Sequence, residues 1–304
     1  MTPAISEFVK QGLRTLGHYR RALSQETFPG VVVLCYHGVR PDGYAAGGHP
    51  LDWLHVPAST FESHCRLIRE CCDPISLDDW RAADAGKANL PKRPVLITFD
   101  DGYRGVVTRA MPILATYDLP AVVFVCTEPM ETRRMLWFDA VVVRDGFDGL
   151  EAWKERPYAE WAEACAGTPC VADDDLRALM TPAELKVLAD MKGIEIGGHT
   201  ARHPILARGS AENQRREIEQ NLQSIAQWTG RAVRAFAYPN GRPGIDYNAD
   251  TLRILRNLNI DSAFTTRPAF ARRDESALER SRFMLLDDAS DAELAHRLTY
   301  SWQR

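Results

Sequence analysis

The 304-residue sequence contains no long apolar run and no large excess of charge of one sign. A membrane-spanning helix needs about 18 or more consecutive apolar residues, and no stretch of the chain approaches this length. The net charge of −4 at pH 7 gives no reason to expect a polyanionic partner, so we expect no binding of nucleic acid. A hydrophobic fraction of 45% is ordinary for a globular protein, and a chain of this length can bury a substantial core.

The cysteines form no CxxC pair and no even set. The seven cysteines are Cys35, Cys65, Cys71, Cys72, Cys126, Cys165 and Cys170. An odd and scattered set favours reduced thiols in the core of a cytosolic protein over a disulfide framework. The pattern gives little support to a zinc site built from thiolates.

The first 29 residues lack the apolar segment and the small-residue cleavage site of a secretory signal, which favours a cytoplasmic location. The apolar residues of this segment are Ile5, Phe8, Val9, Leu13 and Leu16, and its basic residues include Lys10, Arg14, Arg20 and Arg21. Their spacing predicts an N-terminal amphipathic helix within residues 1–29. Two interpretations remain open: the helix packs on its own domain, or it makes a peripheral contact with the inner membrane surface.

Short apolar runs alternate with helical patterns along residues 30–304, which we expect to form one domain. The predicted strands are VVVLCYH (31–37), PVLITF (94–99), AVVFVC (121–126), GIEIGGH (193–199), RAFAYP (234–239) and DSAFTT (261–266). Runs of this kind, buried on both faces, are typical of parallel sheets. Six or seven strand–helix units predict an α/β fold with a barrel or distorted barrel. Ser59 with Glu62 and Thr181 with Glu184 have the spacing of helix capping boxes.

Two segments interrupt this alternation. Residues 38–58 are rich in Gly, Pro and aromatic residues and predict a long loop. Residues 127–180 hold more chain than one crossover needs, and their aromatic residues include Trp137, Trp153, Tyr158 and Trp161. The aromatic residues of this helical insertion either stack on sugars or cover a cleft, or they form the core of a small helical subdomain.

Polar residues follow the predicted strands at four places. The strand ends carry YHGV (36–39), FDDGY (99–103), GGHTARHP (197–204) and AYPNG (237–241). Parallel barrels and sheets place their active sites at the carboxyl ends of the strands. We therefore expect the polar residues of these four segments to converge on one face of the molecule.

His199 and His203 are four residues apart, which on a helix would put both imidazoles on one face. Two glycines precede them, however, and Pro204 disfavours helical conformation at His203, so we expect a loop. For this spacing alone, two ordinary polar side chains are as good an explanation as metal ligands. A pair of carboxylates on another strand end changes this balance, because two histidines and one carboxylate bind a metal and leave positions open for water and substrate.

Asp100 and Asp101 can serve two different purposes in such a site. A metal needs one anionic oxygen ligand, and the water that it activates needs a base. Adjacent side chains of an extended segment point in opposite directions, so this division requires a sharp turn, which Gly102 permits. A surface turn is the alternative explanation of the DDG sequence, but it does not account for the buried strand or for the two histidines.

The motifs TFDDGY (98–103), HTARHP (199–204) and FAYPNG (236–241), in this order, resemble the first three motifs of the polysaccharide deacetylases, the NodB-homology carbohydrate esterases. The resemblance spans about residues 31–286. It implies a distorted (β/α)7 barrel of NodB type with a helical insertion. It also implies a metal-dependent hydrolase that removes an acetyl group, N-acetyl before O-acetyl, from a sugar or glycan.

Carried over by position, the resemblance makes Asp101, His199 and His203 the ligands of one divalent metal ion. Zinc is the expected ion, and Co²⁺, Ni²⁺ or Mn²⁺ are alternatives. Asp100 would be the general base that deprotonates the metal-activated water. The acetylated substrate would be a sugar, a glycan, or a lipid-linked or nucleotide-linked precursor.

The resemblance also assigns residues to substrate binding. A backbone N–H near Tyr103 would stabilise the oxyanion, and Tyr238 with Pro239 would form one wall of the groove. The arginine that orients the base in many members is absent, because Ala237 occupies its position. Arg280 or Arg282 would replace it, and we place Arg280 at the substrate.

The general acid is not evident from the motifs. His37 follows a predicted strand and is our candidate for a catalytic role in the pocket, although a core histidine is the alternative. His296 occurs late in the chain but falls in a predicted terminal helix, where a surface histidine is the better explanation.

Two other functional classes remain open. One is a different metal-dependent C–N hydrolase of a small substrate. The other is a catalytically silent glycan-binding module, which predicts the loss of a ligand or of the base. Both aspartates and both histidines are present, which favours the deacetylase.

Overall fold

A curled parallel sheet forms the centre of the protein. The computed structural model describes residues 6–45, 47–165 and 167–302. The strands of this sheet are β1 (Val32–Tyr36), β4 (Asp73–Pro74), β5 (Pro94–Phe99), β6 (Ala121–Val125), β7 (Ile194–Gly198), β8 (Ala235–Ala237), β9 (Ser262–Phe264) and β10 (Phe283–Met284). Their order is β10-β1-β5-β6-β7-β8-β9, with β4 beside β5, and every paired strand is parallel to its neighbour. The predicted distorted barrel is therefore confirmed, and each predicted strand is present.

The segment that leads into β10 closes the barrel. The backbone N–H of Arg280 donates to Ala263 in β9 (2.9 Å), and that of Leu285 donates to Cys35 in β1 (2.9 Å). The chain thus crosses from the last strand to the first within a few residues. This closing segment, residues 278–285, brings the C-terminal part of the domain against β1.

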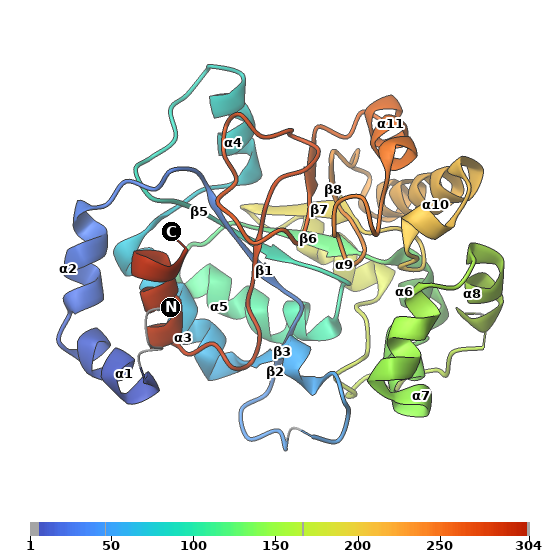
Figure 1. The fold of residues 1–304 in the computed structure, drawn as a ribbon, viewed down its shortest axis with the longest axis horizontal. Helices are drawn as coiled ribbons and strands as arrows, with labels where there is room; N and C mark the ends of the chain where they lie inside the picture. Colours follow the sequence, from blue (N-terminus) through green and yellow to red (C-terminus); the bar gives the residue numbers. More distant parts are fainter. Residues whose placement is uncertain (1–5, 46, 166, 303–304) are drawn as a thin grey trace.

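Helices surround the sheet (Figure 1). They are α3 (Ala58–Cys71), α4 (Leu77–Asp84), α5 (Met111–Thr116), α9 (Pro182–Ala189), α10 (Ala211–Thr229), α11 (Ala249–Asn257) and α12 (Asp291–His296), with short turns at Asp52–Leu54, Val106–Ala110, Leu206–Arg208 and Arg297–Ser301. The capping box of Thr181 and Glu184 begins α9 as predicted. The predicted box of Ser59 is wrong, because α3 begins earlier and the Ser59 hydroxyl donates to Asp42 instead.

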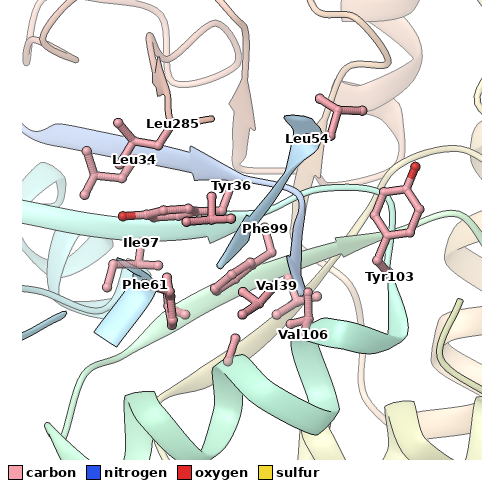
Figure 2. Close-up of a cluster of buried hydrophobic side chains, with 14 of the residues drawn as sticks. Leu34, Tyr36, Val39, Leu54, Phe61, Ile97, Phe99, Tyr103, Val106 and Leu285 are labelled. Atoms are coloured by element: carbon pink, nitrogen blue, oxygen red, sulfur yellow. The ribbon is translucent and has the colours of Figure 1, made fainter. Parts of the chain in front are cut away.

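The core lies on both faces of the strands. Every residue of β5 is buried, as its uninterrupted apolar sequence predicts. Figure 2 shows Tyr36, Phe61 and Phe99 packed together where β1, β5 and α3 meet. The ring centroids of Tyr36 and Phe61 lie 5.1 Å apart, and those of Phe61 and Phe99 lie 5.6 Å apart. Full burial of a phenylalanine stabilises a fold by about 1.5–3 kcal/mol, so this cluster fixes the strand ends that follow it.

The N-terminal segment forms two helices rather than one, α1 (Glu7–Thr15) and α2 (His18–Gln25). Gly17 separates them with a φ of 71°. The polar face of α1 docks on the C-terminal helix: Lys10 pairs with Glu293, and Arg14 lies 3.3 Å from Asp291. Of the apolar residues, Leu13 packs against the core, whereas Phe8 and Leu16 point outward and are 88% and 84% exposed.

The two interrupting segments both contain regular structure. The loop of residues 38–58 carries a small parallel pair, β2 (Gly38–Arg40) and β3 (His55–Pro57). The insertion forms α6 (Thr127–Thr132), α7 (Trp137–Lys154) and α8 (Tyr158–Cys165), at the opposite side of the molecule from α1 and α2 (Figure 1). Trp137 packs edge-on against Trp161, and both are buried, so part of the insertion is a helical subdomain with an aromatic core.

The cysteines and the helices of the structure bear on two expectations from the composition, the reduced thiols and the lack of a long apolar segment. All seven cysteines lie in the described residues and are free, and only Cys170 is exposed. Over the same described part of the chain, each helix is too short or too polar to cross a bilayer.

A close approach at Gly105 gives a test of the fold. A Cβ on Gly105 would lie 2.3 Å from the carbonyl oxygen of Val39 in β2. We expect Gly105→Ala to lower the free energy of unfolding by about 1–3 kcal/mol, because backbone must move to relieve the contact. Urea denaturation measures this loss.

Gly12→Ala is the matched control. Gly12 lies inside α1, and apart from its chain neighbours and the backbone of the helix itself, no described atom lies within 4 Å of the position of its Cβ. This change should raise stability by up to about 1 kcal/mol, because alanine favours helix. Equal effects of the two substitutions would contradict the account of Gly105.

Candidate metal centre and its cavity

The carboxyl ends of β1, β5, β7 and β8 face one cavity of about 260 Å³. The residues predicted to converge there include Asp100, Asp101, His199, His203 and His37, and all five line the cavity. They follow β1, β5 and β7, three of the four strand ends that the sequence predicted to converge. Asn240, which follows β8, lines the cavity as well.

Left-handed backbone turns place the side chains of the two main motifs. Asp101 has a φ of 71° and Gly102 a φ of 89°, so the sharp turn expected at Gly102 already begins at Asp101. Thr200 and His203 have φ values of 68° and 63°, and residues 199–204 form a loop rather than a helix, as predicted. A non-glycine residue in this region costs about 1–3 kcal/mol, and such strain gathers at functional sites.

Asp101, His199 and His203 place their ligating atoms around one point. The Nε2 atoms of His199 and His203 lie 3.4 Å and 3.5 Å from Asp101 Oδ1. One ligating atom from each of the three residues lies within 4.8 Å of the others, and all three side chains are buried.

The donor and acceptor roles of these atoms fit a cation. His199 Nδ1 lies 2.7 Å from the carbonyl oxygen of Ala237, which can only accept, so Nδ1 carries the proton. In the neutral ring, Nε2 then presents a lone pair to Asp101 Oδ1. That oxygen is buried and has no hydrogen-bond partner among the described residues. Two facing acceptors are stable only with a positive charge beside them, so this donor set fits a divalent metal ion.

The electrostatics of the histidines agree with this fit. Burial lowers the pKa of His203 to about 3, so its ring is neutral and can donate a lone pair to a metal. Burial acts against the charged form of His199 too, but the carboxylates of Asp101 and Asp100 outweigh it and raise the pKa of this histidine. The field at the site therefore favours positive charge.

Asp100 is held by a buried arginine. Arg282 Nη1 and Nη2 donate to the two carboxylate oxygens of Asp100, each at 2.7 Å. The arginine side chain is 0% exposed, and that of Asp100 is 5% exposed. Burial alone would raise the pKa of Asp100, but the charge of Arg282 holds it well below its usual range. Asp100 is therefore a carboxylate at neutral pH.

The expectation for Arg280 is wrong. Its guanidinium donates to Asp84 and lies 3.8 Å from the centre of the Trp80 ring, away from the cavity. Arg280 precedes Arg282 by two residues on the closing segment, which puts it about 6–7 Å farther from the carboxyl ends of the strands. Of the two arginines that the sequence left open, Arg282 is the one that contacts the base candidate.

Tyr103, Tyr238 and Pro239 are buried, and the described lining of the cavity does not include them. The Tyr103 hydroxyl donates to Asp139 in α7 at 2.9 Å, and the Tyr238 hydroxyl donates to the carbonyl of Leu278. Both hydroxyls are thus hydrogen-bonded within the protein. Tyr238 and Pro239, which we expected to form one wall of the groove, do not line the cavity, because the motif does not reveal which way their side chains turn. The expected role of a backbone N–H near Tyr103 stays a prediction.

His37 lines the cavity and is partly exposed, and its Nδ1 has no partner within the described part of the chain. With Cys35 and Asp100 it forms a second group of ligand-type atoms. Arg282 already neutralises Asp100, so a metal ion is less favourable there than at Asp101. His296, in contrast, lies in α12 beside Tyr19.

Residues that the sequence did not indicate support the histidine loop. Asn221 in α10 accepts from the His199 backbone N–H (3.1 Å) and donates to the carbonyls of Thr200 (2.7 Å) and Val125 (2.9 Å). A signal was present, because Gln214, Glu217 and Asn221 recur at helical spacing on the buried face of α10. Polar residues on such a face usually make specific hydrogen bonds.

Apolar side chains form much of the remaining wall of the cavity. They are Leu51, Trp53 and Leu54 from the loop, Trp137, Phe138, Phe147 and Leu150 from α7, and Met284 from β10. Trp53 and Phe147 are 36% and 50% exposed, so they remain accessible to a ligand. The insertion thus lines the cleft as well as packing on itself, and contact of its aromatic residues with sugars stays a prediction.

The protein has a parallel barrel with two histidines and a carboxylate at its strand ends. It is therefore an α/β barrel protein with a candidate metal site. A family model described as polysaccharide deacetylase matches residues 87–263, more than half of the chain, and the protein belongs to this family of hydrolases. Its sequence is 33% identical over 103 residues to poly-beta-1,6-N-acetyl-D-glucosamine N-deacetylase of Escherichia coli (strain K12). That match covers 33% of this chain and 15% of the relative.

Solved structures show the same fold. The deacetylase PplD of Streptococcus pyogenes, in complex with acetate, has a TM-score of 0.64 and 21% identity, over 88% of this chain and 98% of that one. IcaB from Ammonifex degensii has a TM-score of 0.64 and 20% identity, over 90% of this chain and 98% of that one. Both likenesses agree with the NodB-type barrel predicted from the motifs.

The Arg282–Asp100 pair gives a test of the site's electrostatics. Arg282→Met leaves a buried carboxylate without a partner, so we expect a loss of about 3–5 kcal/mol in the free energy of unfolding. Adding Asp100→Asn removes the charge and should recover part of this loss. Urea denaturation of the single and double variants measures the coupling.

Arg280→Met is the matched control. Its partner Asp84 is 34% exposed and can be hydrated after the change, so the loss should be clearly smaller. Additive effects of Arg282→Met and Asp100→Asn would show that the pair does not govern stability here.

Proposed function

We propose that the protein is a metal-dependent deacetylase that hydrolyses the N-acetyl group of an amino sugar in a glycan. The observation that carries this proposal is the convergence of Asp101, His199 and His203 in a cavity that also holds Asp100. Family membership supports a hydrolase, and the E. coli relative is named for N-deacetylation of a polymer of N-acetylglucosamine. We extend this substrate class to the present chain.

In this proposal, Asp101, His199 and His203 hold one divalent ion, Zn²⁺ before Co²⁺, Ni²⁺ or Mn²⁺. When bound, the ion supplies a Lewis acid that makes water more acidic and favours negative charge on the acetyl oxygen. The neutral ring of His203 and the carboxylate of Asp101 suit this task.

The chain's own residues move the protons. Asp100, kept ionised by Arg282, takes a proton from the attacking water as the new C–O bond forms. The C–N bond then breaks, and the amine nitrogen needs a proton. We assign this step to His37, which lines the same cavity and has a free ring nitrogen among the described atoms. The products are acetate and a free amino sugar.

The volume and the aromatic walls of the cavity favour a sugar as the substrate. Its volume of about 260 Å³ lies just below the ~300–1,000 Å³ typical of small-molecule pockets, which suits one acetylated sugar unit. Trp53 and Phe147 are placed to pack on sugar faces. A glycan polymer is our first choice of substrate, and lipid-linked or nucleotide-linked precursors are the alternatives.

We further propose peripheral contact with a membrane through α1, on the cytoplasmic side. The polar face of this helix is occupied by ion pairs with α12, so Phe8, Val9 and Leu16 point away from the domain. Exposed Arg20 and Arg21 on α2 supply positive charge nearby. An outward apolar face with adjacent cations suits an anionic lipid surface.

Removal of the ligands tests the proposed chemistry. Asp101→Asn or His203→Gln should abolish tight binding of a divalent ion and acetate release together. Asp100→Asn, an isosteric change at the neighbouring carboxylate, should keep the ion and lose about 10²–10⁴-fold in rate. Metal content after gel filtration and release of acetate measure the two effects separately.

The substrate panel for this experiment contains acetylated oligosaccharides, sugar nucleotides and lipid-linked sugars. Acetate release from none of them, with metal bound, would favour a glycan-binding module. Tight metal binding by Asp101→Asn would refute the ligand assignment.

The membrane contact is tested with lipid vesicles. The double substitution Phe8→Ser and Leu16→Ser should lower binding to anionic phospholipid vesicles roughly tenfold or more, because two apolar side chains no longer enter the bilayer surface. Val187→Ser, at a 66% exposed residue of α9, should leave binding unchanged. A vesicle sedimentation assay compares the natural protein with the two variants. Equal binding of all three would exclude α1 as the membrane contact.

A further inference from the structure

The two candidate histidine ligands are supported in different ways. His199 donates from Nδ1 to the carbonyl of Ala237, the kind of bond that fixes a metal-binding imidazole. His203 Nδ1 is buried and has no such partner within the described residues. Its backbone is in the left-handed region, with a φ of 63°. The orientation of the His203 ring must therefore depend on other contacts.

The first turn of α7 supplies those contacts. The indole N–H of Trp137 donates to the backbone carbonyl of His203 at 2.8 Å. The ring centroid of Phe138 lies 4.9 Å from that of the His203 imidazole, with an angle of 62° between the ring planes. One residue therefore holds the backbone of the ligand and the next packs on its ring.

The third residue of this turn contacts the other metal-ligand motif. Asp139 accepts from the hydroxyl of Tyr103, two residues after Asp101. The backbone carbonyl of Asp139 also accepts from His49, whose other ring nitrogen accepts from the N–H of Leu51. The turn is thereby fixed to the loop of residues 38–58 as well as to the segment that follows β5.

We infer that Trp137 and Phe138 are positioning residues for the metal ligand His203, so that the helical insertion is part of the metal centre. This inference rests on the proposed function, because it takes His203 as a ligand. The hydrogen bond from Trp137 holds the strained backbone of His203. The ring of Phe138 packs on the imidazole, whose Nδ1 has no hydrogen bond within the described residues to fix its orientation. Without them the imidazole would turn away from Asp101.

The two halves of α7 make different contacts. Gly146 interrupts the helix with a φ of 71° and a ψ of −174°. The half before it contacts the ligands, and the half after it lines the cavity with Phe147 and Leu150. The same helix therefore fixes the metal site at one end and the opening of the cavity at the other.

The test compares Trp137→Phe with Trp161→Phe. The first substitution removes an indole N–H that bonds to His203, and the second removes a buried indole N–H that has no partner in the described structure. We expect Trp137→Phe to weaken Co²⁺ and Zn²⁺ binding on the order of tenfold, as loss of outer contacts to metal ligands does. Trp161→Phe should bind both ions as the natural protein does.

Two readouts separate positioning from general stability. The visible absorption spectrum of the Co²⁺ form reports ligand geometry, and it should change in Trp137→Phe and in Phe138→Leu but not in Trp161→Phe or Phe147→Leu. The unfolding temperature of the metal-free proteins shows whether a variant is merely unstable. Phe147 is the matched control for Phe138, because it lies on the same helix and does not contact His203 in the described structure.

The outcomes are distinguishable from failure of the proposed function. A natural protein that binds no divalent ion tightly would refute the ligand set itself. Normal affinity and an unchanged Co²⁺ spectrum in folded Trp137→Phe and Phe138→Leu would overturn only the positioning role. Weaker binding in Trp161→Phe to the same degree would assign the effect to packing of the insertion in general.

Discussion

The buried pair of Arg282 and Asp100 is the interaction on which the site depends. A carboxylate out of water is stable only with a partner, and Arg282 supplies two hydrogen bonds and a full charge. With that charge in place, Asp100 and Asp101 can both stay ionised side by side although both are buried. The arginine comes from the closing segment of the barrel, so barrel closure and site electrostatics are satisfied by the same side chain.

The strands and the four motif residues were predictable because their signals are local. An apolar run such as PVLITF specifies a buried strand, and the position of Asp100 directly after it specifies which end of the barrel it occupies. The choice between Arg280 and Arg282 was not predictable, because it depends on a register between segments far apart in sequence. The side chain of Tyr238 was misplaced for a similar reason, because Leu278, which accepts from its hydroxyl, lies 40 residues away in sequence.

The helical insertion shows the limit of motif-based prediction most clearly. Its aromatic composition indicated either sugar contact or an internal core, and no local pattern connects Trp137 or Phe138 with His203. Their contacts arise only when α7 packs across the strand ends. The insertion is therefore integrated with the barrel ends rather than appended to them, and it supplies part of the wall of the cavity.

The closing segment has a consequence for the order in which the protein becomes functional. Cys35 and Met284 are neighbours in the sheet, although almost the whole domain separates them in sequence. Contacts of such long range form late, because much of the chain must be ordered before they can be made. During synthesis, the two aspartates and two histidines emerge well before Arg282. Asp100 thus acquires its counter-ion only when the two ends of the domain meet, and a partly made chain holds an incomplete site.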